Sequence, residues 1–282
     1  ADVPVNARRT MFRWASIAKS VTAVTATTLL REQILTLDAP IRSWFPRWRT
    51  PGKWLAKCRR GKRELVVNGD VLPCTKGYAD AKVPRSKRAT TLRQLLSHTA
   101  GVMGYGSARG SARPSNKHLK SPKTNRGIEW GLRKLYGMPL IAIPGAEYSY
   151  TTFGFNLIGV IMEHATGRTY PELIAERVAT PAGLLTLQPD YEWKEIPNRA
   201  TGYRKHKRKG IVRSSSTDVS WKAPGGGLIG TPEDLARFCG GLMGNTLLTR
   251  DEKVLLWSPQ MTSDGEPINY GLGFSLGERD GR

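Results

Sequence analysis

"FRWASIAKSVTAV", residues 12–24, places Ser16 three positions before Lys19 at the start of a stretch rich in small and β-branched residues. The spacing predicts a moderately amphipathic helix over residues 16 to about 34. Its buried face is predicted to carry Ile17, Val21, Val24 and Ile34. Residues three apart share a helical face, so the Ser16 hydroxyl and the Lys19 amine are expected within hydrogen-bonding reach.

Such a pair would support nucleophilic catalysis. The free N–H groups and the dipole at a helix N-terminus stabilise negative charge on a serine oxygen and disfavour a protonated lysine. A buried lysine of lowered pKa can then accept the Ser16 proton. The alternative is a serine and a lysine that only share a helical face, because Ser-x-x-Lys occurs by chance in most proteins of this size. The rest of the chain has to decide between them.

Composition indicates a globular protein. The 282 residues are 39% hydrophobic, which suffices for one large domain or two intimate ones. No apolar run approaches the roughly 18 residues that span a bilayer. The N-terminal "ADVPVNARRT" has no apolar signal core, so a targeting segment is expected to be absent or already removed.

The formal charge of +21 is concentrated in three stretches. Eight Lys or Arg lie between Arg47 and Arg63, six more lie between Arg204 and Arg213, and residues 106–126 form the third stretch. Solvated loops are the favoured interpretation, because no aromatic interleaving or nucleic-acid motif accompanies the charge. The alternative is a dedicated site for an anionic polymer, such as nucleic acid, lipid head groups or a wall polymer. Residues 47 to about 90 are predicted to be a basic insertion with one short hairpin around "ELVVNGDVL".

The three cysteines show no metal-binding spacing. Cys58 and Cys74 fit a disulfide in an oxidising compartment and fit two free thiols equally well. Cys239, within a helical pattern, is predicted to be a buried small apolar residue.

Capping signals predict four further helices, which with short strands indicate α with β. The first is "TLRQLLSHTAG", with Thr90 or Thr91 as N-cap, and the second is "FGFNLIGVIMEHATG", ended by Gly167. The third is "TYPELIAERV", capped by Thr169 with Pro171 in its first turn. The fourth is "PEDLARFCGGLM", capped by Thr231 with Pro232 as its first residue and Asp234 completing a capping box.

The order of several segments resembles the serine β-lactamase and penicillin-binding-protein superfamily, in its class C and peptidase-like branch. They are "TMFRWASIAKS", "TLRQLLSHTAGV", "PGAEYSYTTFGFNLIGVIMEHATG", "APGGGLIGTPEDLARF" and "NYGLGFSLG". Within that branch, "NRATGYRK", "SWKAPGGG" and "YTTFG" are most similar to the mitochondrial β-lactamase-like serine proteases and their bacterial relatives. The resemblance implies one domain over residues 1–282 with an α/β (α+β), β-lactamase/transpeptidase-like fold. Its helical part is expected to be largely present and its antiparallel sheet incomplete.

The resemblance also implies site residues. Ser16 would be the acylated nucleophile and Lys19 its proton partner. The family's Tyr-x-Asn motif falls on Tyr150 and Thr152, so Tyr150 would take part in proton transfer and Thr152 would contact substrate. Tyr148 offers a competing register, but the position of Gly154 favours Tyr150. Threonine lacks the two-sided amide of asparagine, which makes β-lactam recognition less expected.

The family's third motif, Lys or His followed by x and Gly, is expected on a strand after "NYGLGFSLG". The sequence to Arg282 does not include it, and two preceding strands are expected ahead of residue 1. The chain is therefore expected to be truncated at both ends, as a fragment, a gene remnant, or a chain whose missing strands come from elsewhere. "HTAG" at 98–101 and "RKG" at 208–210 lie in the wrong places, so His98 is predicted to be structural. Gly225–Gly227 are predicted to form a tight backbone passage at the active-site rim rather than a phosphate loop.

The functional prediction is a serine hydrolase that forms an acyl-enzyme on an amide or ester, a peptidase or esterase more than a dedicated β-lactamase. A small-molecule or peptide substrate is expected, with no cofactor or metal. A periplasmic or secreted location is favoured because most relatives work there. The alternative is a catalytically impaired member that binds an anionic polymer or membrane surface through its basic loops.

Overall fold

The computed structural model describes residues 4–67, 69–75, 77–104, 127–133, 135, 138–214 and 217–277. The helices are α1 (Ala18–Arg31), α2 (Leu92–Leu96), α3 (Glu129–Leu132), α4 (Thr152–Thr166), α5 (Tyr170–Ile174), α6 (Thr180–Ala182), α7 (Ala223–Gly226), α8 (Pro232–Met243) and α9 (Arg250–Trp257). The strands are β1 (Phe12–Arg13), β2 (Lys53–Lys57), β3 (Glu64–Val67), β4 (Asp70–Pro73), β5 (Tyr78–Lys82), β6 (Gln188–Pro189), β7 (Tyr203–His206), β8 (Gly210–Arg213), β9 (Leu228–Gly230), β10 (Gln260–Met261) and β11 (Pro267–Ile268). Two 3₁₀ turns matter for the site, η1 (Ala15–Ile17) and η7 (Ser220–Lys222).

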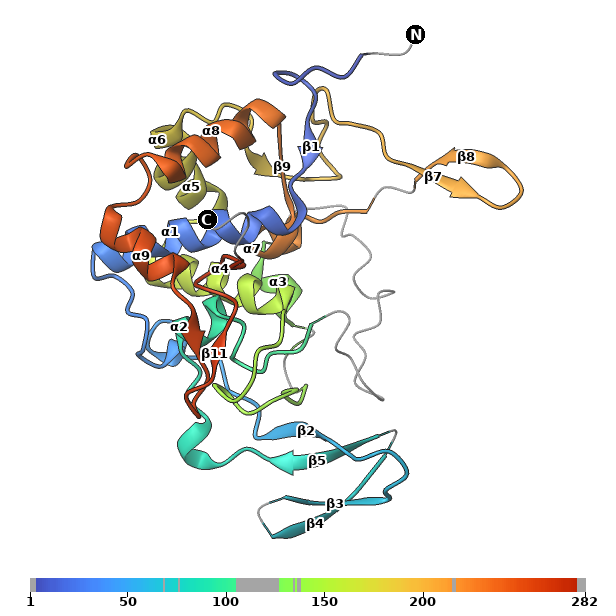
Figure 1. Cartoon of the computed structure of the whole chain (residues 1–282). Coiled ribbons are helices and arrows are strands. Elements are labelled where there is room, and N and C mark those ends of the chain that lie inside the picture. Colours follow the sequence, from blue (N-terminus) through green and yellow to red (C-terminus); the bar gives the residue numbers. More distant parts are fainter. Residues whose placement is uncertain are drawn as a thin grey trace.

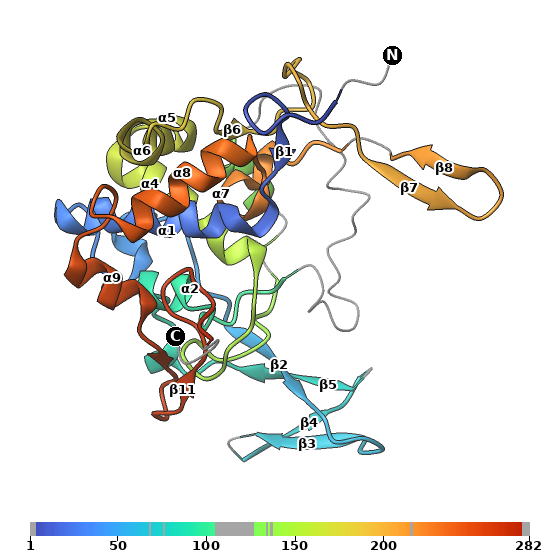
Figure 2. The ribbon, with the colours of Figure 1, turned by 45° about the horizontal axis from the view of Figure 1, so that its top comes forward.

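Helix α1 lies at the centre of the helical body (Figures 1 and 2) and packs against α4, α5 and α7. It is buried nearly all round rather than along one stripe, so the predicted amphipathic helix is wrong in this respect. Its alanines and threonines are small enough for neighbours to approach from several sides. The buried hydroxyls of Thr22, Thr25 and Thr27 each donate to the carbonyl four residues earlier, which satisfies them without water. Ile17, predicted on the buried face, is 38% exposed because it belongs to η1.

A three-stranded antiparallel sheet in the order β1–β9–β6 leads directly into this helix. Phe12 pairs with Gly230 and Arg13 with Ile229, while Gln188 pairs with Ile229 from the other side of β9. Because η1 begins two residues after β1 ends, the sheet fixes where Ser16 enters the helical body.

The predicted capping signals mostly hold. Thr91 and Thr169 form capping boxes, and Gly167 ends α4 with a left-handed φ of 70°. Thr231 caps α8, but Asp234 does not return the bond as predicted. The Asp234 carboxylate instead accepts from the Leu185 N–H and from the Thr186 N–H and hydroxyl, which ties α8 to the loop that follows α6.

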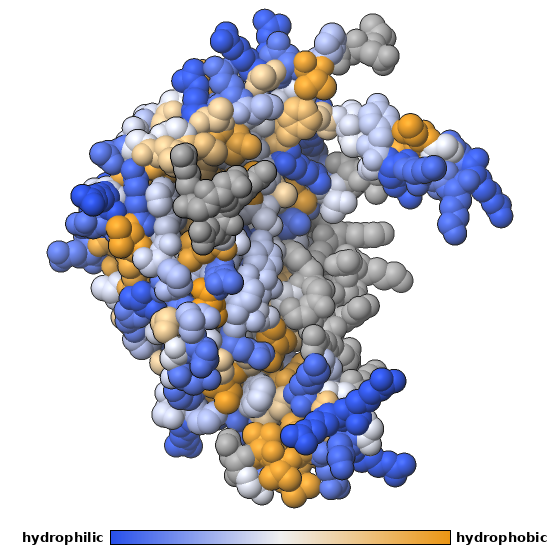
Figure 3. Space-filling model, viewed as in Figure 1, coloured by the Kyte–Doolittle hydropathy of each residue, from blue (hydrophilic) through white to orange (hydrophobic). Residues whose placement is uncertain are grey.

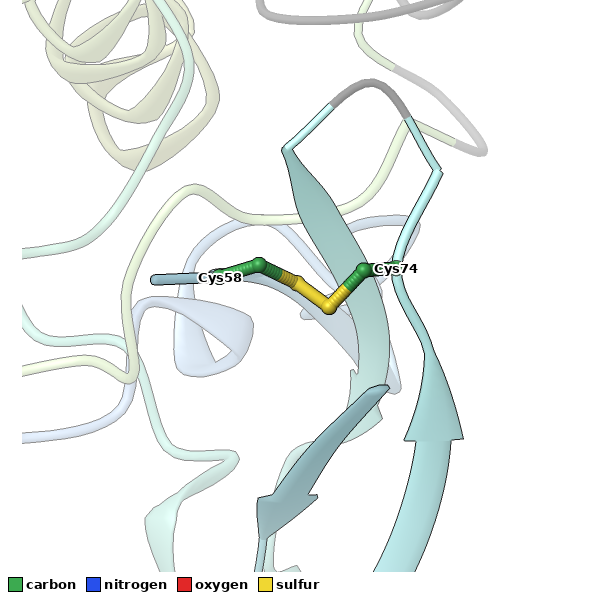
Figure 4. Close-up of a disulfide and its surroundings, with 2 residues drawn as sticks. All are labelled: Cys58 and Cys74. Atoms are coloured by element: carbon green, nitrogen blue, oxygen red, sulfur yellow. A yellow bond between two sulfur atoms is a disulfide. The ribbon is translucent and has the colours of Figure 1, made fainter. Parts of the chain in front are cut away.

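Within residues 47–90, the hairpin predicted around "ELVVNGDVL" is confirmed as β3 paired with β4, and a second antiparallel pair, β2 with β5, was not predicted. Cys58 and Cys74 form a disulfide across them (Figure 4), which decides between the two alternatives that the sequence left open. Hydrogen bonds between β2 and Leu140 tie the pair β2–β5 to the rest of the chain. The third cysteine, Cys239, is exposed on α8, so its predicted burial is wrong.

The basic stretch at 204–213 forms the hairpin β7–β8, which projects away from the body in Figures 1 and 2. The prediction of a loop is wrong here, although the predicted exposure to solvent holds. The stretch at 106–126 lies outside the described residues. Within the described part of the chain, no helix is both long and apolar enough to cross a bilayer.

Candidate active site

Ser16 sits in a tight turn between the sheet and the central helix. The preceding residue, Ala15, has φ 47°, a left-handed conformation that is uncommon for alanine. Ser16 itself is exposed, whereas Lys19 one helical turn later is 1% exposed. The turn therefore presents a hydroxyl to solvent directly above a buried amine.

The Lys19 amine has three kinds of neighbour. Its Nζ lies 3.4 Å from the Ser16 Oγ and donates to the Gly225 carbonyl at 2.5 Å. It also lies over two aromatic faces, 4.6 Å from the centroid of Tyr150 and 5.7 Å from that of Phe155. One hydrogen bond and two ring faces hold the nitrogen beside the serine.

The surroundings lower the pKa of Lys19 from its ordinary value of 10.5 to about 7. Burial is the larger cause, and the positive charge of Lys222 in η7 is the second. A substantial fraction of the amine is thus unprotonated near neutral pH. In that state the nitrogen can accept the Ser16 proton, as predicted for a buried lysine at this position.

The structure brings Tyr150, and not Tyr148, to the lysine. Tyr150 precedes the N-cap of α4, and its ring is the one under the Lys19 amine. Tyr148 packs instead against His98 and Tyr270, with ring centroids 5.8 and 5.6 Å away. The register with Tyr150 as the motif tyrosine is the one in which the ring meets Lys19.

Thr152, predicted to contact substrate, is the first residue of α4 and packs on Gly225. A Cβ at Gly225 would come within 2.5 Å of the Thr152 Cγ2 and 2.6 Å of its carbonyl oxygen. Only glycine therefore lets the carbonyl of residue 225 reach Lys19 past the start of α4. A Cβ added at Gly226 would lie 3.5 Å from the Ala15 carbonyl oxygen. The predicted tight passage therefore lies against the Ser16 turn.

The "NYGLGFSLG" segment also reaches the central helix. Gly273, at φ 85°, accepts from the Ser20 hydroxyl at 3.1 Å and donates its N–H to the Leu96 carbonyl. Tyr270 of the same segment packs against His98 with the two rings tilted, their centroids 4.9 Å apart. The other four segments on which the resemblance rests thus converge around the segment that carries Ser16 and Lys19.

Two contributors to this site were not predicted from the sequence. The Gly225 carbonyl is 206 positions from Lys19, and no local pattern marks it as the lysine's hydrogen-bond acceptor. Lys222 looked like one more basic residue, yet it lies close enough to lower the pKa of Lys19. The run of three glycines just after Lys222 predicted a tight passage near the site, but neither of these two contacts.

Comparison with known proteins identifies the family. The model of the beta-lactamase family matches residues 1–282. The chain belongs to the beta-lactamase family. Solved structures of the same fold include the penicillin-binding protein from Bacillus halodurans, with a TM-score of 0.67, 22% identity, and coverage of 96% of this chain and 70% of that one. The D-stereospecific amidohydrolase from Streptomyces sp. has a TM-score of 0.65 at 21% identity, covering 94% of this chain and 70% of that one.

Three curated relatives show the range of the family. Protein Rv1367c of Mycobacterium tuberculosis is 28% identical over 98% of this chain and 67% of its own length. The serine beta-lactamase-like protein LACTB, mitochondrial, of Homo sapiens is 24% identical over 96% of this chain and 57% of its own length. Esterase EstB of Burkholderia gladioli is 26% identical over 62% of this chain and 37% of its own length. The chain thus spans between about a third and two thirds of these relatives, and family members include hydrolases.

Proposed function

We propose that this chain carries the nucleophile of a serine hydrolase that acts through an acyl-enzyme on an ester or amide. The observation that supports it most is the exposed Ser16 hydroxyl 3.4 Å from a buried Lys19 whose pKa is about 7. A lysine in that state is an effective general base for a serine. The relatives named as an esterase and an amidohydrolase support the same reaction class.

In the first half of the reaction, the Ser16 Oγ attacks the substrate carbonyl carbon and its proton passes to the Lys19 Nζ. The first N–H groups of a helix lack intrahelical acceptors, so the Ser16 N–H is the donor this turn offers to the oxyanion. As the bond to the leaving group breaks, that alcohol or amine takes the proton from Lys19, with the Tyr150 hydroxyl as the relay. The acyl group stays on Ser16 as an ester.

In the second half, a water molecule attacks the acyl ester and gives its proton to Lys19. The ester bond to Ser16 breaks, the Oγ takes that proton back from Lys19, and a carboxylic acid leaves. Lys19 ends each half-reaction unprotonated, which its lowered pKa favours. Neither half-reaction uses a redox step or a cofactor.

Esters and amides are proposed over β-lactams because Thr152 replaces the asparagine of the family motif. The Thr152 hydroxyl can hydrogen-bond one substrate group, whereas an asparagine amide offers both a donor and an acceptor. Thr152 also packs on Gly225, so its side chain has little freedom to adapt to a different substrate.

A substrate panel tests this proposal in the present chain and in the open reading frame that contains it. Acetyl and butyryl nitrophenyl esters, a D-amino acid amide and a chromogenic cephalosporin are compared with Ser16→Ala as the control. Ser16-dependent release from the ester or amide, faster than from the cephalosporin, supports the proposal. A folded protein that hydrolyses none of them, or only the cephalosporin, contradicts it.

The β7–β8 hairpin favours a second candidate function, attachment to an anionic surface. Six lysines and arginines lie within 204–213 without an acidic residue. Tyr203 and Ile211 are 65% and 78% exposed. Tyr203 pairs with Arg213, and Ile211 pairs with Lys205, which lies two residues after Tyr203 on β7, so all four side chains stand on the same face of the hairpin. Figure 3 shows the hairpin standing clear of the body, mostly hydrophilic with an apolar spot. Cations beside exposed apolar side chains suit a membrane interface with anionic lipids.

Vesicle sedimentation at two salt concentrations tests this candidate. Binding to vesicles that contain phosphatidylserine, but not to neutral ones, and steep loss of binding with salt support it. Lys207→Ser, Arg208→Ser and Lys209→Ser together should remove the binding. Salt-insensitive binding, or none, contradicts it, and salt-sensitive binding to single-stranded nucleic acid alone would show that the surface serves another polymer.

A further inference from the structure

His98 lies beneath the candidate active site, at the end of α2. It follows the C-cap Ser97 and has φ 62°, a left-handed conformation that histidine adopts more readily than most residues. The residue is 1% exposed. Its ring contacts Tyr150 at 4.5 Å and Phe155 at 5.1 Å between centroids, the two rings that also face Lys19.

His98 accepts hydrogen bonds from both neighbours of Tyr150. The Ser149 N–H donates to the His98 carbonyl at 2.8 Å, and the Thr151 N–H donates to the His98 Nδ1 at 3.2 Å. The Thr151 hydroxyl donates to the Met103 carbonyl at 2.9 Å, and this bond fixes the Thr151 side chain as well. One residue thus holds the backbone before Tyr150, the backbone after it, and the face of its ring.

We propose that His98 is a positioning residue that clamps Tyr150 in place over the Lys19 amine. The proposal rests on the proposed function, because Tyr150 is useful only if Ser16 and Lys19 form an acyl-enzyme. It goes beyond a packing role, since the bond to Thr151 needs an acceptor at one atom of the side chain. Tyr150 is itself 43% exposed and follows a loop, so without the clamp little would fix its ring.

The clamp requires a neutral imidazole with its proton on Nε2, because Nδ1 accepts from Thr151. Burial, and after it the positive charge of Lys19, lower the pKa of His98 to about 3. Tyr148 and Tyr270 also border the ring, and burial raises the pKa of both phenols, so neither supplies a negative charge that would favour protonation of His98 at neutral pH. The acceptor at Nδ1 is therefore available over the whole range in which Lys19 titrates.

Two substitutions separate the clamp from packing. His98→Phe keeps a ring in the same place and loses the acceptor. His98→Asn loses the ring but offers its Oδ1 where Nδ1 stood, and asparagine tolerates a left-handed φ. Tyr148→Phe is the matched control, because it alters another aromatic contact of His98 and leaves both backbone bonds in place.

The first measurement is the rate of Ser16 acylation by a fluorophosphonate probe in a double-mutant cycle. We expect His98→Phe to slow acylation by about 10-fold or more, because misplacing a catalytic group by a fraction of an ångström has effects of that order. His98→Asn should recover most of the rate, and Tyr148→Phe should change it by less than about twofold. In a Tyr150→Phe background, His98→Phe should have almost no further effect. Equal slowing in both backgrounds, or no slowing in the first, would overturn the clamp.

The second measurement does not depend on catalysis. Hydrogen exchange at the Thr151 amide should be slow in the unmodified chain and in His98→Asn, and faster by about 10-fold or more in His98→Phe. Unchanged exchange in His98→Phe would overturn the clamp. If the unmodified chain is not acylated at all, the proposed function fails, and the exchange result still shows whether His98 holds Tyr150.

Discussion

At the scale of single residues, the lysine beside the serine is the centre of the site. Lys19 is buried, donates to the Gly225 carbonyl and lies over the Tyr150 ring. These contacts could hold an ammonium as well as an amine. Burial and the charge of Lys222 favour the amine, and the lowered pKa is the net result.

The acylation rate should therefore rise with pH through about 7, as Lys19 loses its proton. Lys222→Met removes a like charge that lowers this pKa, so the rise should move to higher pH. Lys209→Met, on the distant β7–β8 hairpin, is the matched control and should leave the profile in place. The measurement is the second-order rate of fluorophosphonate labelling between pH 5 and 9; an unmoved or downward-shifted profile in Lys222→Met would contradict the assignment.

Lys19 should also leave a signature in stability. Its pKa is about 7 in the folded chain and near 10.5 in the unfolded chain, so between these values only the unfolded chain holds the proton. The contribution of Lys19 to the free energy of unfolding is therefore highest above the pKa of the unfolded chain. That contribution is lost as the pH falls to the pKa of the folded chain. Relative to Lys19→Met, the free energy of unfolding should rise with pH by up to about 1.4 kcal/mol per unit in this window. Parallel curves for the two proteins in urea titrations would contradict it.

At the scale of elements, helix ends could be predicted from the sequence because capping depends on nearby residues. Thr91, Thr169 and Gly167 act within three residues of the helix ends they fix. Asp234 was misjudged because its donors, at Leu185 and Thr186, are nearly fifty positions away. The burial of α1 on all sides and the Gly225 carbonyl on Lys19 were missed for the same reason, since tertiary packing decides both.

The pairing of Ser16 with Lys19 needed only helical spacing, and the structure places the two side chains together as expected. The choice of Tyr150 over Tyr148 needed the position of α4 as well. His98 was expected to be structural from its segment alone; its two bonds around Tyr150 became visible only in three dimensions.

The disulfide should stabilise its own region more than the site. Cys58 and Cys74 are 16 positions apart, and closing a loop of that size contributes about 3 kcal/mol in the chain-entropy account. Paired replacement, Cys58→Ser with Cys74→Ser, should speed hydrogen exchange in β2–β5 and change Ser16 acylation by less than about twofold. Cys239→Ser is the control. Loss of acylation without global unfolding would show that the disulfide-linked strands support the site directly.

At the scale of the whole molecule, the two candidate functions occupy separate surfaces. The Ser16 turn lies between β1 and α1. The β7–β8 hairpin projects away from the helical body (Figures 1 and 3). Replacing Lys207, Arg208 and Lys209 together by serine should therefore abolish salt-sensitive vesicle binding and leave the acylation rate within about twofold. Coupled loss of both activities would contradict this separation. Vesicle sedimentation and probe labelling on the same preparation provide the comparison.

The most direct test of the central claim is the site of covalent modification by a fluorophosphonate, mapped by peptide mass spectrometry on the folded protein. We expect one adduct, on Ser16, that is absent from Ser16→Ala and forms about 100-fold or more slowly in Lys19→Met, because Lys19 is the general base in the proposed mechanism. A folded chain that takes up no probe, or takes it up at another residue, would contradict the proposed function.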